Sequence, residues 1–230
     1  MPLDPVIQLH GAVALLGQFP VLAGVDLEVG DGERVLLRGP NGAGKTSLLR
    51  TCAGLIPVSS GSATVLGHDL RVDRRSVRPL VGLMAHTTGL YDDLTAADNV
   101  RFWAQACRVD PADAAGAMDR VGLATRLRTV PVNRLSTGQR RRVSLAAMIV
   151  RRPRLWLLDE PHAGLDTVGR DLVDRLIGDA AAAGATVLFA SHDLERADAV
   201  ADRTVSIVGG AVAEDTGPLS ADRTGADDVA

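Results

Sequence analysis

The sequence is poor in aromatic residues and cysteine, and each shortage narrows the kinds of protein that it can be. Aromatic residues make up 3% of the 230 residues, too few for a surface that binds single-stranded nucleic acid by base stacking. The two cysteines, Cys52 and Cys107, have neither zinc-ligand spacing nor an obvious disulfide role, which fits a reducing compartment. No apolar run approaches the ~18 residues of a membrane-spanning helix, and the N-terminus lacks a secretory signal. We therefore expect a soluble, cytoplasmic chain.

Charge of one sign is not in excess either. The formal net charge is −3, so no overall basic field points to a nucleic-acid partner. Two arginine runs, 140–142 and 151–154, are explained by their helices. The first lies within a predicted helix, and the second surrounds a helix end, where cations are favoured. We predict no nucleic-acid partner.

Lysine is nearly absent, which draws attention to the one that is present. Among 25 basic residues the only lysine is Lys45. It lies in Gly39-Pro40-Asn41-Gly42-Ala43-Gly44-Lys45-Thr46, which matches the phosphate-binding loop (P-loop) pattern G-x-x-x-x-G-K-[ST]. A compact ammonium reaches phosphate oxygens inside a tight loop, where a planar guanidinium fits poorly. A glycine-rich turn with an accidental lysine is the alternative.

The surroundings of this run favour the P-loop. A strand is predicted at Arg34–Arg38 and a helix at Thr46–Cys52, so strand, loop and helix follow in the required order. Such a loop turns successive backbone N–H groups toward phosphates, and the helix N-terminus adds partial positive charge. Thr46 can offer its hydroxyl to Mg²⁺. The run predicts a nucleoside triphosphate site.

Strands and helices are predicted along the rest of the chain in an α/β order. Strand-like runs lie at Val6–His10, Val25–Val29, Arg34–Arg38 and Ala63–Leu66. Three helices with capping residues follow, at Thr95–Cys107, Asp110–Val121 and Ser136–Ile149. Strands return at Leu155–Leu158, Thr186–Ala190 and Val205–Val208, with helices at Thr167–Ala183 and Leu194–Val200 between them. This order predicts an α/β P-loop fold with a helical insert.

One domain accounts for the whole chain. We expect core segments at about 1–85 and 153–217, a helical subdomain at about 86–152, and a frayed polar tail at 218–230. No internal repeat is present, which excludes a second nucleotide-binding domain within these residues.

Two carboxylates follow the apolar strand Leu155–Leu158. Asp159 and Glu160 stand at its carboxyl end, the edge of a parallel sheet where ligands bind. Asp159 is placed to hold Mg²⁺ opposite Thr46, and Glu160 to orient or deprotonate the attacking water. A solvated acidic turn is the alternative, and the P-loop in the same chain makes it the weaker one.

A histidine follows the next predicted strand. If the two strands are neighbours, His192 lies beside Glu160, where it can contact a γ-phosphate and the attacking water. By itself it would be interpreted as a hydrogen-bonded loop residue. The remaining candidates, His10, His68 and His162, form no metal-ligand set. We interpret these three as ordinary surface or turn residues.

The run Leu135-Ser136-Thr137-Gly138-Gln139 opens a predicted helix with Ser136 at its N-cap, and a helix N-terminus is an anion site. Alone it would be explained as a capping motif. Together with the P-loop, Leu155–Glu160, Gly164-Leu165-Asp166 and His192, it resembles the nucleotide-binding subunits of ATP-binding cassette (ABC) transporters in order, spacing and nearly full length.

The resemblance implies a P-loop NTPase with a RecA-like mixed-sheet core, an N-terminal antiparallel β part and an inserted α-helical subdomain. It further implies an ATPase that uses ATP and Mg²⁺ and forms a head-to-tail homodimer (or paired cassette) with ATP between the subunits. Ser136 and Gly138 of one subunit would meet the γ-phosphate held by the other, and Gly164–Asp166 would touch across the dimer. The residues expected to bind phosphate are Gly39, Pro40, Asn41, Gly42, Ala43, Gly44, Lys45, Thr46 and Ser47.

Three positions depart from the family pattern. His86 stands where the family usually has a glutamine that senses Mg²⁺ and contacts the membrane partner. Thr137 replaces the first glycine of the usual signature pair, which loosens the expected γ-phosphate contact. The aromatic residue that normally stacks on adenine is missing, because the matching position is near the aliphatic Leu16, and Phe19 is the substitute.

The resemblance also narrows the kinds of protein complex in which this chain is expected to act. We expect an energy-supplying subunit on the inner face of the cell membrane, bound to a separate polytopic permease. His86, the compact length and Leu155–Pro161 are similar to the haem exporters of cytochrome c maturation, whereas Pro161–Gly164 departs from them. An exporter of drugs, lipids or polysaccharide is the rival. A soluble ATPase of iron–sulfur assembly is the alternative of another class.

Overall fold

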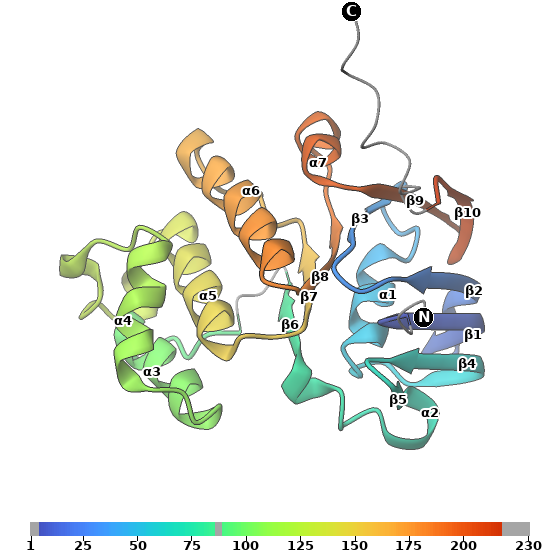
Figure 1. Ribbon diagram of the computed structural model, residues 1–230, viewed down its shortest axis with the longest axis horizontal. Coiled ribbons are helices and arrows are strands. Elements are labelled where there is room, and N and C mark those ends of the chain that lie inside the picture. Colours follow the sequence, from blue (N-terminus) through green and yellow to red (C-terminus); the bar gives the residue numbers. More distant parts are fainter. Residues whose placement is uncertain (1–4, 86–88, 218–230) are drawn as a thin grey trace, which may run out of the picture.

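The computed structural model describes residues 5–85 and 89–217, and two β-sheets organise them (Figure 1). The first sheet is antiparallel, with the order β2 (Phe19–Val29), β1 (Ile7–Leu16), β4 (Val58–Val65) and β5 (His68–Asp69). The second has the order β10 (Ala211–Asp215), β9 (Arg203–Val208), β3 (Arg34–Arg38), β8 (Thr186–Ala190), β7 (Leu155–Asp159) and β6 (Val81–Met84). Its neighbours are parallel except β9 and β10. The predicted α/β class with an antiparallel N-terminal part is confirmed.

Helix α1 (Lys45–Cys52) packs between the two sheets. Leu48, Leu49 and Cys52 are fully buried in one apolar cluster, to which both sheets contribute side chains. Side chains alternate along each central strand, so Leu157 of β7 faces this cluster while Leu158 faces the opposite side of the sheet. The P-loop helix is therefore held on both sides by apolar contacts.

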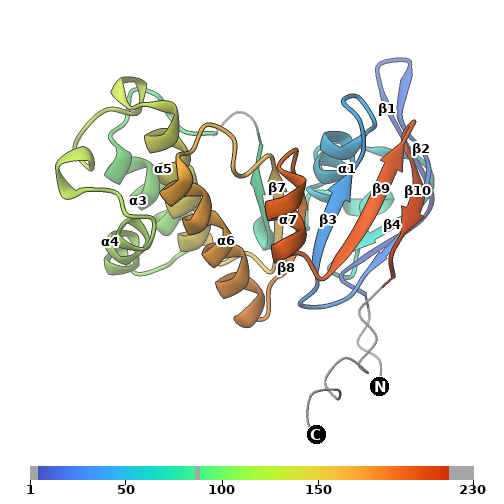
Figure 2. The ribbon, with the colours of Figure 1, turned by 90° about the horizontal axis from the view of Figure 1, so that it is seen from above.

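The other face of the large sheet is covered by α6 (Thr167–Ala182) and α7 (Leu194–Val200), which share a second apolar cluster with it. The same cluster extends into α3 (Ala96–Ala106), α4 (Pro111–Arg120) and α5 (Thr137–Arg151), which gather beyond the β6 edge (Figure 2). Thr95, Asp110 and Ser136 cap these three helices as predicted. A short helix, α2, covers Leu70–Asp73.

The structure adds elements that the sequence pattern did not predict. Strands β1 and β2 form one long hairpin rather than two short runs, and β5, β6 and β10 were not predicted. Strand β6 contains Gly82, where an added Cβ would lie 2.7 Å from Pro153, and glycine weakens the usual strand signal.

His86 and the expected tail lie outside the described residues. Within residues 5–85 and 89–217, no helix combines the length and the apolar character needed to span a bilayer.

Candidate functional site

The P-loop joins β3 to α1 and approaches neighbouring backbone closely. At Gly39, with φ 138°, an added Cβ would lie 2.1 Å from the carbonyl oxygen of Ile207. At Gly44, with φ 111°, it would lie 2.9 Å from that of Val21. Both positions therefore require glycine. Lys45 is 8% exposed, and its Nζ donates to the carbonyls of Gly39 (2.6 Å) and Pro40 (3.0 Å).

Thr46 and Asp159 meet across the pocket, 113 residues apart in the chain. The hydroxyl of Thr46 donates to Asp159 Oδ2 over 2.8 Å, and Asp159 is 8% exposed at the end of a wholly buried strand. A hydroxyl and a carboxylate are hard oxygen donors of the kind that Mg²⁺ takes, and Mg²⁺ commonly binds one or two protein oxygens together with substrate phosphates. Among the described residues, no three His, Cys, Asp or Glu side chains are grouped as a metal cage. The Thr46 hydroxyl and the Asp159 carboxylate therefore fit a Mg²⁺ ion that binds together with a nucleotide.

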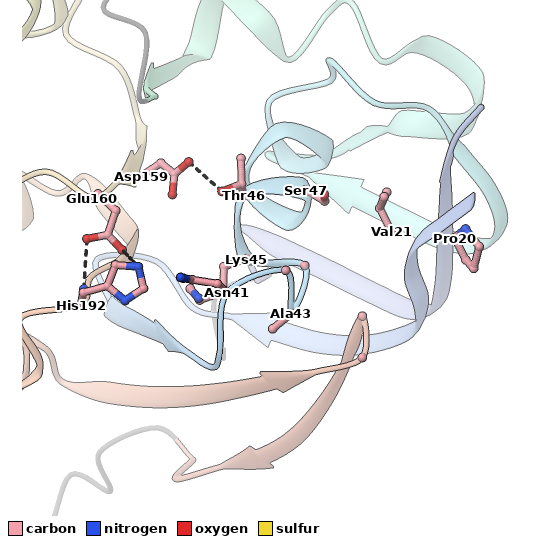
Figure 3. A pocket seen from close by; sticks show the side chains of 14 residues that line it. Pro20, Val21, Asn41, Ala43, Lys45, Thr46, Ser47, Asp159, Glu160 and His192 are labelled. Atoms are coloured by element: carbon pink, nitrogen blue, oxygen red, sulfur yellow. Dashed lines mark hydrogen bonds and ion pairs between the residues drawn. The ribbon is translucent and has the colours of Figure 1, made fainter. Parts of the chain in front are cut away.

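Glu160 and His192 also lie together, because β7 and β8 are parallel neighbours with Asp159 opposite Ala190. The backbone N–H of His192 donates to Glu160 Oε2 (3.0 Å), and His192 Nε2 lies 3.3 Å from Glu160 Oε1. Glu160 has φ 53°, a left-handed conformation that is uncommon for a residue other than glycine. Figure 3 shows this pair on one side of the pocket and the Thr46–Asp159 pair next to it.

These groups line one cavity of about 580 Å³. It brings together the P-loop from Asn41 to Ser47, both carboxylates and His192, as the sequence predicts for a single site. Gly39 and Pro40 are not among its lining residues. Four further lining residues were not predicted: Pro20, Val21, Gly209 and Gly210.

The side of the pocket near β2 differs from the expected adenine-stacking position. Pro20 and Val21 line the cavity, whereas Leu16 and Phe19 do not. Phe19 is 78% exposed. The cavity lining contributed by β2 is therefore aliphatic, and the expected adenine-stacking positions lie outside that lining.

The Gly209–Gly210 turn connects β9 to β10 and rests on the P-loop. Gly210 donates its N–H to Ala43 O and accepts at its carbonyl from Ala23 N–H, each over 2.8 Å. An added Cβ at Gly210 would lie 3.1 Å from Ala23 N. The Gly-Gly pair after a predicted strand is a turn signal in the sequence, but nothing in the sequence places that turn on the phosphate loop.

The signature residues Leu135–Gln139 do not line this cavity. Ser136 and Gln139 form a reciprocal capping box at the N-terminus of α5. Beside it lies the Gly164–Asp166 loop, where an added Cβ at Gly164 would be 3.1 Å from Thr137 Cγ2. The two predicted contact regions thus pack against each other, away from the pocket of the same chain.

Arg141 is a further residue of the site that the sequence pattern does not reveal. It is 4% exposed and donates to the backbone carbonyls of Asp159 (3.3 Å), Glu160 and Pro161 (3.4 Å). Burial lowers the pKa of its guanidinium, and the charges of Asp159 and Glu160 oppose that effect. Arg141 therefore fastens α5 to the turn that carries both carboxylates.

His162 lies in a turn, as one of the two expected placements has it, but it is not a surface residue. Its side chain is buried, with the residue 4% exposed, and Nε2 lies 2.7 Å from Asp174 Oδ1. The sequence pattern did not reveal this burial because the turn after β7 folds inward against α6. His10 is exposed and His68 is half-buried, as expected.

A family model described as "ABC transporter" matches residues 22–163. The chain belongs to the ABC transporter family. It is an ATP-binding subunit of such a transporter, and its activity is ATP hydrolysis.

Relatives and solved structures agree with this assignment. The chain is 39% identical to the "Cytochrome c biogenesis ATP-binding export protein CcmA" of Nitrosomonas europaea over 76% of its own length and 83% of that protein. It is 36% identical to the "Daunorubicin resistance ATP-binding protein DrrA3" of Streptomyces coeruleorubidus over 98% of its length and 73% of that protein. A solved ATP-binding subunit of an ABC transporter superposes with TM-score 0.84 at 25% identity, covering 93% of this chain and 90% of that one.

Proposed function

We propose that this subunit powers export through a separate membrane subunit, and that its cargo is haem for cytochrome c maturation. The observation that carries the ATPase part is the single cavity shared by the P-loop, Asp159, Glu160 and His192. The chain acts as one ATP-binding domain, with a core at 1–85 and 153–217 and a helical subdomain at 86–152. The support for the cargo is the likeness to CcmA.

ATP binding follows from the loop geometry. The backbone N–H groups of the P-loop and the N-terminus of α1 favour the phosphates, and Lys45 supplies a buried positive charge beside them. Thr46 and Asp159 would hold Mg²⁺, which offsets phosphate charge when it is bound. The narrow loop excludes side chains at Gly39 and Gly44, which keeps the backbone open to phosphate oxygens.

The Glu160–His192 pair supports the proposed mechanism of hydrolysis. The carboxylate of Glu160 is held by the backbone N–H and ring of His192, so it points in a fixed direction at the edge of the cavity. There it accepts a proton from the attacking water or orients that water in line with the γ-phosphate. His192 contacts the γ-phosphate from the same side.

A second subunit completes the site. Ser136 and Gly138 lie at a helix N-terminus suited to phosphate, yet neither lines the cavity of its own chain. In a head-to-tail homodimer this N-terminus meets the γ-phosphate held by the partner, with Gly164–Asp166 at the subunit contact. Closure of the two copies on ATP couples hydrolysis to movement.

An aromatic patch offers a surface for the membrane subunit. The sequence has three Phe, two Trp and one Tyr, and three of these side chains, Tyr91, Phe102 and Trp103, stack edge to face at 5.1 and 5.4 Å between centroids. Arg151 lies 4.5 Å above the ring of Trp103. Tyr91 and Phe102 are exposed, and exposed aromatic side chains are enriched at protein interfaces. Binding through this patch places the chain on the inner face of the membrane.

Export of a drug-like compound is the second candidate, because the likeness to DrrA3 extends over 98% of the chain. One experiment separates the two. In the native organism the gene is replaced by a Lys45→Ala version produced at the same level, and covalent haem in c-type cytochromes is measured beside drug accumulation. Loss of c-type haem with b-type haem retained supports haem export. Normal c-type haem with raised drug accumulation overturns it in favour of the second candidate.

The partner is tested separately. Tagged protein purified from detergent-solubilised membranes is expected to bring down a polytopic membrane protein. Recovery with soluble partners alone would overturn the proposed membrane partner and favour a role with soluble partners, as in an assembly ATPase.

A further inference from the structure

A series of polar contacts links the two loops that carry Glu160 and His192. It begins at His162, two residues after Glu160, whose Nε2 lies 2.7 Å from Asp174 Oδ1 on α6. Asp174 Oδ2 pairs with Arg196 on α7, four residues after His192. Because α6 and α7 lie side by side (Figures 1 and 2), one carboxylate bridges both loops.

The His162 end of this series is deeply buried. His162 is 4% exposed, and its Nδ1 has no hydrogen-bond partner within the described residues. A buried polar atom without a partner destabilises the fold, so packing alone would favour an apolar side chain of this size. Among the described residues, the bond to Asp174 is the one polar contact of the imidazole, and it ties the turn after β7 to α6.

The Arg196 end is held by several acidic groups. Arg196 Nη1 donates to Asp171 Oδ1 (2.8 Å), and its Nε lies 4.0 Å from Asp193 Oδ2. Asp193 also faces Arg170, at 3.4 Å. Since Asp193 directly follows His192, the start of α7 is fastened to α6 at the point where His192 leaves the sheet.

The contacts form a closed ring, because Glu160 and His192 also touch each other directly. We propose that Asp174 is a positioning residue for hydrolysis: through His162 and Arg196 it holds the Glu160 and His192 loops at a fixed separation. The inference rests on the proposed roles of Glu160 and His192. The neutralised variant Asp174→Asn keeps the shape of the side chain and weakens both arms of the bridge.

Asp179 supplies a matched control on the same helix. It pairs with Arg120 at 2.9 Å, and both side chains are more than half exposed. Asp179→Asn therefore removes one carboxylate and one ion pair from α6 without touching either loop of the site.

The test compares kcat and KM for ATP in the complete complex with its membrane subunit. Asp174→Asn is expected to lower kcat roughly 10- to 100-fold, because a misplacement of about 1 Å costs rates of that order. KM for ATP should stay within about twofold of the wild-type value, because no P-loop atom takes part in the contacts between His162, Asp174 and Arg196. Asp179→Asn should leave both constants unchanged. A purely structural role of Asp174 predicts instead that Asp174→Asn lowers thermal stability and leaves kcat of the folded fraction unchanged.

Two further variants address the arms separately. His162→Asn and Arg196→Gln should each lower kcat, and their combination should lower it no more than the larger single effect, since both act through Asp174. Arg196→Lys should restore part of the loss. If Asp174→Asn does not fold, the His162 and Arg196 variants still test the proposal.

The outcomes distinguish this inference from the proposed function. Slow hydrolysis by Glu160→Gln with normal kcat in Asp174→Asn overturns the positioning role alone. Wild-type kcat in Glu160→Gln overturns the proposed role of Glu160 and the inference with it. Additive losses from His162→Asn and Arg196→Gln also contradict the bridge.

Discussion

Both carboxylate oxygens of Glu160 are engaged by His192. Oε2 accepts the backbone N–H at 3.0 Å, and Oε1 lies 3.3 Å from the ring nitrogen Nε2. A carboxylate held at two points by one residue keeps its direction without help from a bound ligand. The left-handed backbone of Glu160 (φ 53°) and the Arg141 bond to its carbonyl fix the other end of the same residue.

Replacing Glu160 tests its role in hydrolysis. Glu160→Gln keeps the size of the side chain and removes its ability to accept a proton, so turnover should fall about 10²- to 10⁴-fold while ATP still binds. An ATP-bound dimer should then accumulate, measured by size-exclusion chromatography with radiolabelled ATP. Glu214→Gln, at an exposed position on β10, is the control. Unchanged turnover in the purified complex would refute the catalytic role.

Lys45 should decide ATP affinity. Lys45→Ala removes a buried cation at the proposed phosphate position, and a hydrogen bond to a charged group contributes about 1.5–3 kcal/mol. The Kd for ATP should therefore rise by at least about tenfold, measured by isothermal titration calorimetry. Arg50→Ala, in the last turn of the same helix, should leave Kd near the wild-type value. A wild-type Kd for ATP in Lys45→Ala would contradict the assignment of the P-loop to the ATP-binding site.

Much of this site could be predicted from the sequence because its parts are local. The P-loop, the Asp159–Glu160 pair and His192 each follow a predicted strand, and the carboxyl ends of neighbouring parallel strands meet at one edge. The strand–loop–helix order alone places Lys45 and Thr46.

Other parts depend on contacts between distant segments. Gly210 reaches the P-loop only because β9 lies next to β3 in the sheet. Arg141 lies in an arginine run whose neighbours are partly exposed, so its burial depends on the packing of α5 against the turn after β7. No period or spacing in the sequence distinguishes it from Arg140 or Arg142.

The aromatic patch should govern binding to the membrane subunit. Phe102→Asp places a charge at the centre of Tyr91, Phe102 and Trp103, so co-purification of the membrane protein should be lost while the Kd for ATP stays unchanged. Phe19→Asp is the control, since Phe19 is an exposed aromatic residue on β2, in the other sheet. Equal loss in both variants, or retention in Phe102→Asp, would contradict the patch as the docking surface.

The two thiols should differ in reactivity. Burial raises the pKa of the Cys52 thiol to about 12, whereas Cys107 is only half-buried. At pH 8 the native protein should therefore react with one equivalent of iodoacetamide, at Cys107, and with a second only after unfolding. Mass spectrometry of the labelled chain measures both. Rapid labelling of native Cys107→Ser protein would show that the α1 core opens readily.

Acid should weaken the β9–β10 hairpin through Asp215. The bidentate contact of Arg203, at 2.7 and 2.5 Å, holds the pKa of Asp215 below its ordinary value, against the effect of burial. The unfolded chain takes up this proton near pH 4, so the stabilisation is complete above that pH and is lost as pH falls through the native pKa. Asp215→Asn should lower the free energy of unfolding at pH 7 and converge with wild type in acid, measured by urea titration. A pH-independent difference would contradict the linkage.

The order of the large sheet also has a consequence for the way the protein is made. Among the described strands, β3, which leads into the P-loop, is hydrogen-bonded only to β8 and β9, both later in the chain. The ribosome therefore releases the phosphate loop long before the two strands that support it. Until residues 186–208 have emerged, the loop has no sheet beneath it, and until Gly210 follows, it lacks its last backbone contact. Nucleotide binding therefore requires the chain to be synthesised at least as far as Gly210, which keeps shorter nascent chains from binding ATP.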